Sequence, residues 1–298
     1  MKKGNPHYPV EALLENINET LIKLGTHFEF NNAFRNGLNN KIKFILSDNL
    51  ISDVAELDFQ NQIRIYDNFC QFFWCLCFSS ILFYDKGIIE KQMTTGFSGN
   101  IDISENETKL AYDVFKAGIG LLHNCQEITP RHVFFELPNP YNNVKHDYVA
   151  KSNNVFCYGM AFIIYHEFSH FQFEHISSTK ENEEVADSNS FWTLYLNSPE
   201  DEKITANIGM ILALCALIFL DNTMKGDDNH PDSDLRLESL IKNIESEFDH
   251  YWGIACISIK MWAFNYGFEN EFPDVKEIDS WKSYFRVILE YLVKFKSI

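Results

Sequence analysis

Basic residues are scarce in this sequence. It contains 25 lysines and arginines against 42 aspartates and glutamates, and its formal net charge at pH 7 is −17. Proteins that bind nucleic acids concentrate lysine and arginine on one face, where these side chains contact phosphates. We therefore expect no nucleic-acid partner, and we expect any macromolecular partner to be a protein.

The sequence also lacks the features of secreted and membrane-spanning proteins. Its start, MKKGNPHYPVEALL, has no uninterrupted apolar region and no small-residue cleavage site of the kind that a signal peptide carries. The apolar run 208–220 is shorter than the roughly 20 residues that span a bilayer, and it indicates a buried helix. The cysteines are odd in number and mostly lie in apolar runs, as reduced thiols do. We therefore expect a cytoplasmic protein with no membrane span.

No repeat, low-complexity tract or Gly/Ser linker divides the chain, so its organisation must be inferred from changes in hydrophobic period. The segments KIKFILS, VAELDF and QIRIY, within 41–66, predict a small N-terminal sheet because β-branched and aromatic residues partly alternate in them. The almost wholly apolar stretch 65–84 predicts a buried helix. The polar, glycine-containing stretch 85–107 suggests a lobe boundary or a covering loop. We predict an N-terminal α+β lobe over 1–95 and a helical domain over 96–298.

The second half of the chain is predominantly helical in its pattern, with one extended segment, HVFFELP. Ser198, followed by proline and three acids, predicts the start of a helix at that serine. The other predicted helices cover 107–123, 154–173, 233–248 and 275–295. The fold class is therefore a predominantly helical α+β protein.

The predicted helix over 154–173 is apolar around nearly its whole circumference until the sequence His166-Glu167-Phe168-Ser169-His170. His166 and His170 lie one turn apart and within roughly 40° of each other, so both rings can reach one metal ion. Glu167 projects to the side, where it can act as the general base on a zinc-bound water. The alternative is a pair of ordinary core or surface histidines, because HExxH arises by chance in roughly one protein in a hundred.

A catalytic zinc site needs three protein ligands and one open position. The sequence Glu183-Glu184-Val185-Ala186-Asp187 places Glu183 and Asp187 one turn apart on a new helix. Glu183 can ligate zinc while Asp187 hydrogen-bonds the far nitrogen of a ligand histidine. The alternative for Glu183 is an acidic first turn favoured by the helix dipole. His175 is the other candidate third ligand, but its spacing does not match HExxHxxGxxH, so we interpret it as structural.

A later turn, Asn229-His230-Pro231, precedes Arg236 by a few residues. His230 could donate a hydrogen bond to the oxyanion formed during hydrolysis, and Arg236 could orient an acidic group beside the site. The residues alone favour the plainer interpretation, in which the turn is an ordinary polar loop and Arg236 lies on a solvated helix face.

The succession HEFSHFQFEH, ENEEVAD and NHPDSDLRL resembles the gluzincin metallopeptidases of the HtpX and CAAX-processing type. Within that group the sequence is similar to the Lit family of phage-exclusion peptidases over residues 69–237. The resemblance implies Zn²⁺ on His166, His170 and Glu183, with Glu167 as the base. It also implies that elongation factor Tu is the substrate and that a phage capsid protein provides the activating signal. The linker between His170 and Glu183 is shorter than in Lit and the first 60 residues show little likeness, so the resemblance supports the zinc chemistry more firmly than the substrate or trigger.

The sequence thus predicts that residues 96–298 form a helical, zincin-like catalytic domain. The protein is expected to be a zinc-dependent endopeptidase that hydrolyses a cytosolic protein by promoted-water attack. Three alternatives stay open. The chain could be a non-catalytic zinc-containing binding or sensor protein, a housekeeping quality-control metallopeptidase, or a membrane-associated processing peptidase.

Overall fold

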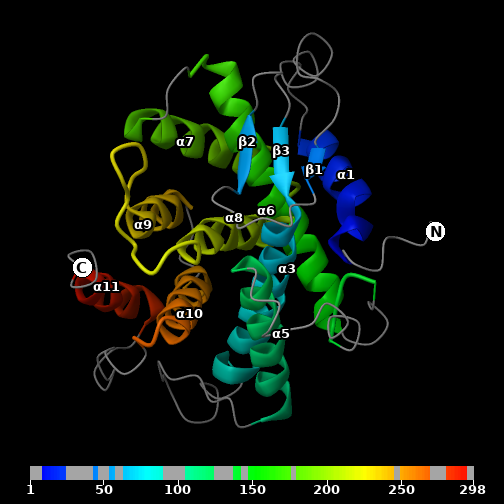
Figure 1. Ribbon diagram of the computed structural model, residues 1–298, viewed down its shortest axis with the longest axis vertical. Helices are drawn as coiled ribbons and strands as arrows, with labels where there is room; N and C mark the ends of the chain where they lie inside the picture. The colour runs from blue at the N-terminus through cyan, green and yellow to red at the C-terminus, as the bar shows by residue number, and fades with distance from the viewer. Residues whose placement is uncertain are drawn as a thin grey trace.

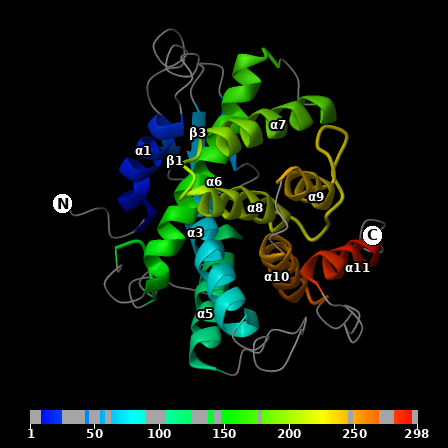
Figure 2. The ribbon, with the colours of Figure 1, turned by 180° about the vertical axis from the view of Figure 1, so that it is seen from behind.

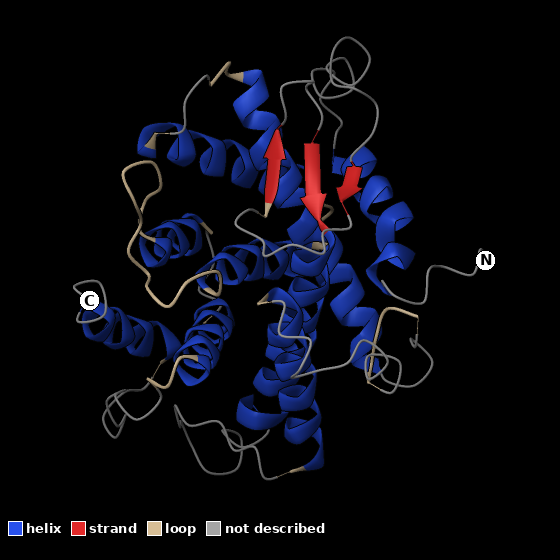
Figure 3. Ribbon diagram, viewed as in Figure 1, coloured by secondary structure: helices blue, strands red, loops and turns tan. Residues whose placement is uncertain are grey.

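The computed structural model describes residues 9–24, 43–45, 54–57, 63–89, 105–123, 137–141, 147–175, 179–244, 249–268 and 280–293. It is a predominantly helical α+β fold with a small sheet, as the sequence predicts (Figures 1 and 3). Its elements are η1 (Pro9–Leu13), α1 (Leu14–Leu24), β1 (Lys43–Ile45), β2 (Ala55–Leu57), β3 (Ile63–Tyr66), α3 (Asp67–Leu82), η2 (Phe83–Ile89), α5 (Asn106–Leu122), α6 (Asp147–Gln172), α7 (Lys180–Asn197), α8 (Lys203–Ile218), α9 (Ser233–Asn243), α10 (His250–Asn265) and α11 (Trp281–Leu292).

The sheet forms from the three segments that the sequence predicts as strands. Its order is β1-β3-β2, with β1 parallel to β3 and β2 antiparallel to β3. Ile63 and Ile65 of β3 are buried, whereas Arg64 and Tyr66 are partly exposed, so the strand presents one face to the core. Strand β2 is at one edge of the sheet and packs against α6.

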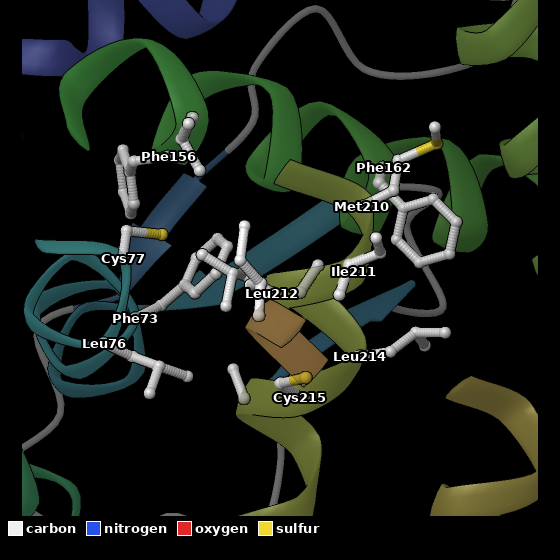
Figure 4. Close-up of a cluster of buried hydrophobic side chains, with 14 of the residues drawn as sticks. Phe73, Leu76, Cys77, Phe156, Phe162, Met210, Ile211, Leu212, Leu214 and Cys215 are labelled. Carbon is white, nitrogen blue, oxygen red and sulfur yellow. The ribbon is translucent and has the colours of Figure 1, made fainter. Parts of the chain in front are cut away.

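The core forms where α3, α6 and α8 meet. Figure 4 shows Phe73 of α3, Phe156 of α6 and Leu212 of α8 among the buried side chains that fill this region. Helix α5 lies beside α3 in both ribbon views (Figures 1 and 2). The apolar stretch 65–84 is therefore a buried helix because other helices cover it on several sides.

Helices α6 and α8 cross at two glycines. A Cβ atom on Gly209 would lie 2.7 Å from the Val155 carbonyl oxygen, and one on Gly159 would lie 2.8 Å from the Gly209 carbonyl oxygen. Only glycine leaves room for backbones this close. This crossing anchors the middle of α6, about two turns before His166.

One helical stretch among the described residues, Asp67–Ile89, is long and apolar enough to cross a membrane by length and composition. Its apolar window is 78% buried inside the protein. A buried core helix satisfies the same criteria, so the expected absence of a membrane span stays a prediction.

The structure corrects one predicted helix start. Ser198 caps the C-terminal end of α7, where its hydroxyl donates to the Leu194 carbonyl oxygen at 2.7 Å, and α8 begins only at Lys203. Proline after a helix end is as common as proline inside a helix start, so the Ser-Pro pair has two interpretations. Helix α6 also begins earlier than predicted, at Asp147 instead of residue 154. Helices α1 and α10 were not predicted from the sequence.

Several predictions fall outside the described residues. They include Cys125, most of the HVFFELP segment and the central part of the stretch 85–107. The proposed division at residue 95 also lies there, so the two-domain organisation stays a prediction. The described cysteines are free and buried, as expected of reduced thiols.

Candidate metal centre and active-site cleft

Two helices bring three potential metal-binding side chains together. The last turns of α6 present His166 and His170, and the first turns of α7 present Glu183. The Nε2 atoms of the two histidines are 3.1 Å apart. The Glu183 carboxylate lies 3.2 Å from His166 Nε2 through Oε2 and 3.4 Å from His170 Nε2 through Oε1. The two Nε2 atoms and the Glu183 carboxylate therefore point to a common place.

The separations of 3.1 to 3.4 Å are close to those between the ligands of a tetrahedral ion, and two of them are slightly shorter. Zinc bonds of about 2.0–2.2 Å in tetrahedral geometry place neighbouring ligand atoms about 3.3–3.6 Å apart. Among the described residues, the groups able to hold a metal consist of His166, His170 and Glu183. His175 is not in this cluster and instead contacts the other ring nitrogen of His170, with the two Nδ1 atoms 3.0 Å apart.

The start of α7 explains why Glu183 points inward. Thr179 caps the helix, and its side-chain oxygen accepts a hydrogen bond from the Asn182 backbone N–H. Glu183 then lies on the face toward α6 and is 5% exposed, whereas Glu181 and Glu184 are exposed to solvent. An acidic first turn accounts for the two exposed glutamates but does not by itself account for burial of the third.

A chain of polar contacts reaches His166 from α9. Asp187 of α7 lies 3.0 Å from His166 Nδ1 through Oδ1. Arg236 of α9 donates to both Asp187 oxygens, from Nε and from Nη2, each at 2.7 Å. The Arg236 side chain is 10% exposed, so this is a buried bidentate pair rather than a solvated surface contact. The structure thus brings together the two residues that the sequence suggested as an orienting group and its partner.

The electrostatics of the cluster favour a positive charge at its centre. Burial acts to lower the pKa of His166, but hydrogen bonds to Asp187 and Glu183 raise it overall to about 9. Burial, together with the neighbouring His166 charge, lowers the pKa of His170 to about 4. Burial acts to raise the pKa of Glu183, but His166 and Arg236 lower it to about 2. In the metal-free protein, protonated His166 therefore supplies the positive charge that the carboxylates of Glu183 and Asp187 favour.

The two site helices are joined in a way that the sequence did not reveal. Asn189 of α7 donates from Nδ2 to the Ser169 hydroxyl of α6 at 2.8 Å, and that hydroxyl donates to the Tyr165 carbonyl oxygen. Ala186 is fully buried, consistent with its predicted role of allowing the helices to approach. These contacts hold α7 against the turn that carries the histidines.

His166 and Glu183 lie at the wall of a cleft of about 480 Å³. Helices α6 and α8, the edge strand β2 and the segment before α9 all contribute to its walls. Glu167 lines this cleft together with His166, Glu183 and Arg236. Phe162 belongs to its apolar wall. The predicted base Glu167 is therefore accessible from the same space as the predicted ligands His166 and Glu183.

His230 also lines the cleft. Its side chain is 49% exposed, and its Nδ1 atom lies 3.0 Å from Asp227 Oδ1. A Cβ atom on Gly226 would lie 2.1 Å from the His230 carbonyl oxygen, so this turn requires glycine. The predicted position of His230, on a turn before a helix, is confirmed, whereas its contribution to an oxyanion site stays a prediction.

Comparison with known proteins gives one family. The family described as Peptidase U49 matches residues 63–255, which include the sheet strand β3 and the helices α3 to α9. No curated protein and no solved structure matches the chain. The match covers well over half of the chain and includes His166, His170 and Glu183. The chain therefore belongs to the peptidase U49 family.

Proposed function

We propose that this peptidase is a zinc-dependent endopeptidase of the HExxH, gluzincin type, with Zn²⁺ bound by His166, His170 and Glu183. The observation that carries the proposal is the convergence of two Nε2 atoms and one carboxylate at 3.1 to 3.4 Å. The Nδ1 atoms of the histidines face Asp187 and His175. If those nitrogens carry the protons, both Nε2 lone pairs face each other and the carboxylate, an arrangement that a dication stabilises.

The residues around the cleft support hydrolysis. A zinc ion bound there would supply a Lewis acid that polarises the scissile carbonyl and increases the acidity of water. Glu167 takes the proton from the attacking water and delivers it to the leaving amine nitrogen. His230 also lines the cleft, where its imidazole can donate to the oxyanion that develops on the carbonyl.

We further propose that the substrate is a protein segment in extended form. Among the described residues, the outer edge of β2 has no strand partner, and Val54 and Ala55 at that edge line the cleft. A strand edge can pair with a substrate backbone, and the apolar wall of Phe162, Ile163 and Leu217 can contact its side chains. Strand β2 is therefore the strand edge that we propose for pairing with the substrate.

The identity of that substrate is proposed from resemblance. Lit is a U49 peptidase, so family membership agrees with the likeness to Lit in the sequence. We accordingly propose elongation factor Tu as the first substrate to test, a phage-derived protein as activator, and the cytoplasm as the compartment.

The test compares the purified wild-type protein with Glu167→Gln and with Glu184→Gln, which changes an exposed glutamate outside the cleft. Each protein is mixed with bacterial lysate, with and without phage capsid components, and new protein termini are identified by mass spectrometry. We expect wild type and Glu184→Gln to cleave, and Glu167→Gln to retain metal but lose cleavage by at least about 100-fold.

Other outcomes would identify the alternatives. Equal cleavage by Glu167→Gln and wild type would contradict the assigned base and favour a structural zinc site. Fragments from many unrelated proteins, instead of elongation factor Tu, would favour a housekeeping quality-control peptidase.

A further inference from the structure

The chain reverses direction immediately after α6. Glu174 has a φ of 52°, and it is the non-glycine residue with positive φ in the described part of the chain. The His175 backbone N–H donates to the His170 carbonyl oxygen at 3.0 Å, and the Glu174 N–H donates to the Phe171 carbonyl oxygen at 3.3 Å. This is the hydrogen-bond pattern of a helix that ends in a left-handed residue, a position that usually holds glycine. The turn folds His175 back over the last turn of α6.

This turn places the His175 imidazole against His170. The two Nδ1 atoms are 3.0 Å apart, and the ring centroids are 5.1 Å apart with an angle of 69° between the planes. Phe173 stacks on His175 with ring centroids 5.8 Å apart, so an apolar neighbour supports the ring. Five residues along a continuing helix would have carried His175 away from His170, and only the reversal brings the rings together.

One proton must lie between the two Nδ1 atoms at this distance. His170 Nε2 faces His166 Nε2 and the Glu183 carboxylate. To bind a metal there, Nε2 must be unprotonated, which places the ring proton of neutral His170 on Nδ1. His175 Nδ1 must then be the acceptor, and the ring proton of His175 must lie on its own Nε2.

We infer that His175 is a positioning residue for the second metal-binding histidine. It accepts a hydrogen bond from His170 Nδ1–H and so fixes both the tautomer and the ring orientation of His170; Asp187, whose Oδ1 lies 3.0 Å from His166 Nδ1, is placed to do the same for His166. This inference rests on the proposed zinc site. It adds that the third histidine, although close to the cluster, binds no metal itself.

Two substitutions distinguish the contribution of the His175 Nδ1 acceptor from that of the aromatic ring. His175→Phe keeps an aromatic ring but removes the acceptor, whereas His175→Asn places a side-chain oxygen near the position of Nδ1. His123→Asn is the matched control, because His123 lies at the end of α5 beside Tyr266 and outside the cleft. Zinc affinity is measured by competition with a chelator, and the coordination of Co²⁺ by its visible absorption.

We expect His175→Phe to weaken zinc binding about 10- to 100-fold and His175→Asn to recover most of that loss. The Co²⁺ spectrum should keep its shape in His175→Asn, and His123→Asn should match wild type. Wild-type zinc affinity in His175→Phe would overturn the inference, as would no recovery in His175→Asn. A Co²⁺ spectrum altered in both His175 variants would also overturn it, because His175 would then be a ligand.

A measurement on the metal-free wild-type protein separates this inference from the zinc proposal. Nitrogen-15 NMR of the imidazoles reports which nitrogen of His170 carries the proton, and it needs no variant to fold. A proton on Nδ1 that shifts to a mixture of tautomers in His175→Phe supports the contact even if wild type binds no zinc. A proton on Nε2 in wild type would refute the inference even if zinc binds.

Discussion

The polar chain from Arg236 through Asp187 to His166 allows a quantitative prediction. Arg236 and Asp187 share two hydrogen bonds of 2.7 Å, and their side chains are 10% and 16% exposed. Removing one member of a fully buried pair costs about 3–5 kcal/mol. Because both side chains keep some contact with water, we expect Arg236→Met and Asp187→Asn each to lower the free energy of unfolding by about 2–4 kcal/mol.

The interaction itself is measured by a double-mutant cycle. Unfolding of the metal-free protein by urea is followed for wild type, both single variants and the double variant. We expect a coupling energy of about 1.5–3 kcal/mol, because Arg236→Met removes both hydrogen bonds, and Asp187→Asn removes the negative charge and the hydrogen bond to the atom that becomes an amide nitrogen.

A second cycle provides the control. Lys242 and Glu238 also form a 2.7 Å contact, but their side chains are 56% and 22% exposed. An exposed pair of this kind should couple by only about 0.3–0.5 kcal/mol. If the coupling between Arg236 and Asp187 is as small as in this control, the two residues do not act as a buried unit, and our explanation of how His166 is oriented is refuted.

Two further predictions concern stability. Gly209→Ala should lower the free energy of unfolding by about 1–3 kcal/mol, because the new Cβ would meet backbone atoms of Val155 and Gly159. Urea unfolding compares this variant with Ala213→Gly, which removes a methyl group from the same helix. If Gly209→Ala lowers the free energy of unfolding by no more than Ala213→Gly does, the close crossing of the two helices is contradicted. Burial lowers the pKa of Lys260 to about 8, so at pH 7 the folded protein holds a poorly solvated charge, and Lys260→Met should be more stable than wild type by about 1–2 kcal/mol. Between about pH 8 and 10 the unfolded chain binds more protons at Lys260 than the folded chain does, so wild type gains stability and this advantage should shrink; a difference that stays constant with pH would exclude a titration of Lys260 as its cause.

Local patterns predicted much of the fold. The strands within 41–66 and the buried helix of 65–84 were identified because alternation and continuous hydrophobicity reflect burial on one or on all sides. Helix α10 was missed although it is almost wholly buried, because Gly253, Ser258 and Lys260 interrupt its apolar run and its buried faces leave no 3.6-residue period to detect. The helix start predicted at Ser198 was wrong because serine followed by proline occurs at both ends of helices.

The candidate site also has parts that the sequence predicted and parts that it did not. The spacing of His166, His170 and Glu183 could be interpreted from sequence because one turn of helix and one short connection place them together. The contact between Arg236 and Asp187 spans 49 residues and depends on how α9 packs on α7, which no local pattern records. The position of His175 depends on the left-handed conformation of Glu174, and glutamate gives no signal for that conformation.

The central claim is that one zinc ion is bound jointly by α6 and α7. It is tested most directly by metal analysis of the purified wild-type protein, Glu183→Gln and Glu184→Gln, after dialysis against a weak chelator. We predict about one zinc per chain in wild type and in Glu184→Gln, and little or none in Glu183→Gln. Absence of zinc from wild type, or full retention of zinc by Glu183→Gln, would contradict the account.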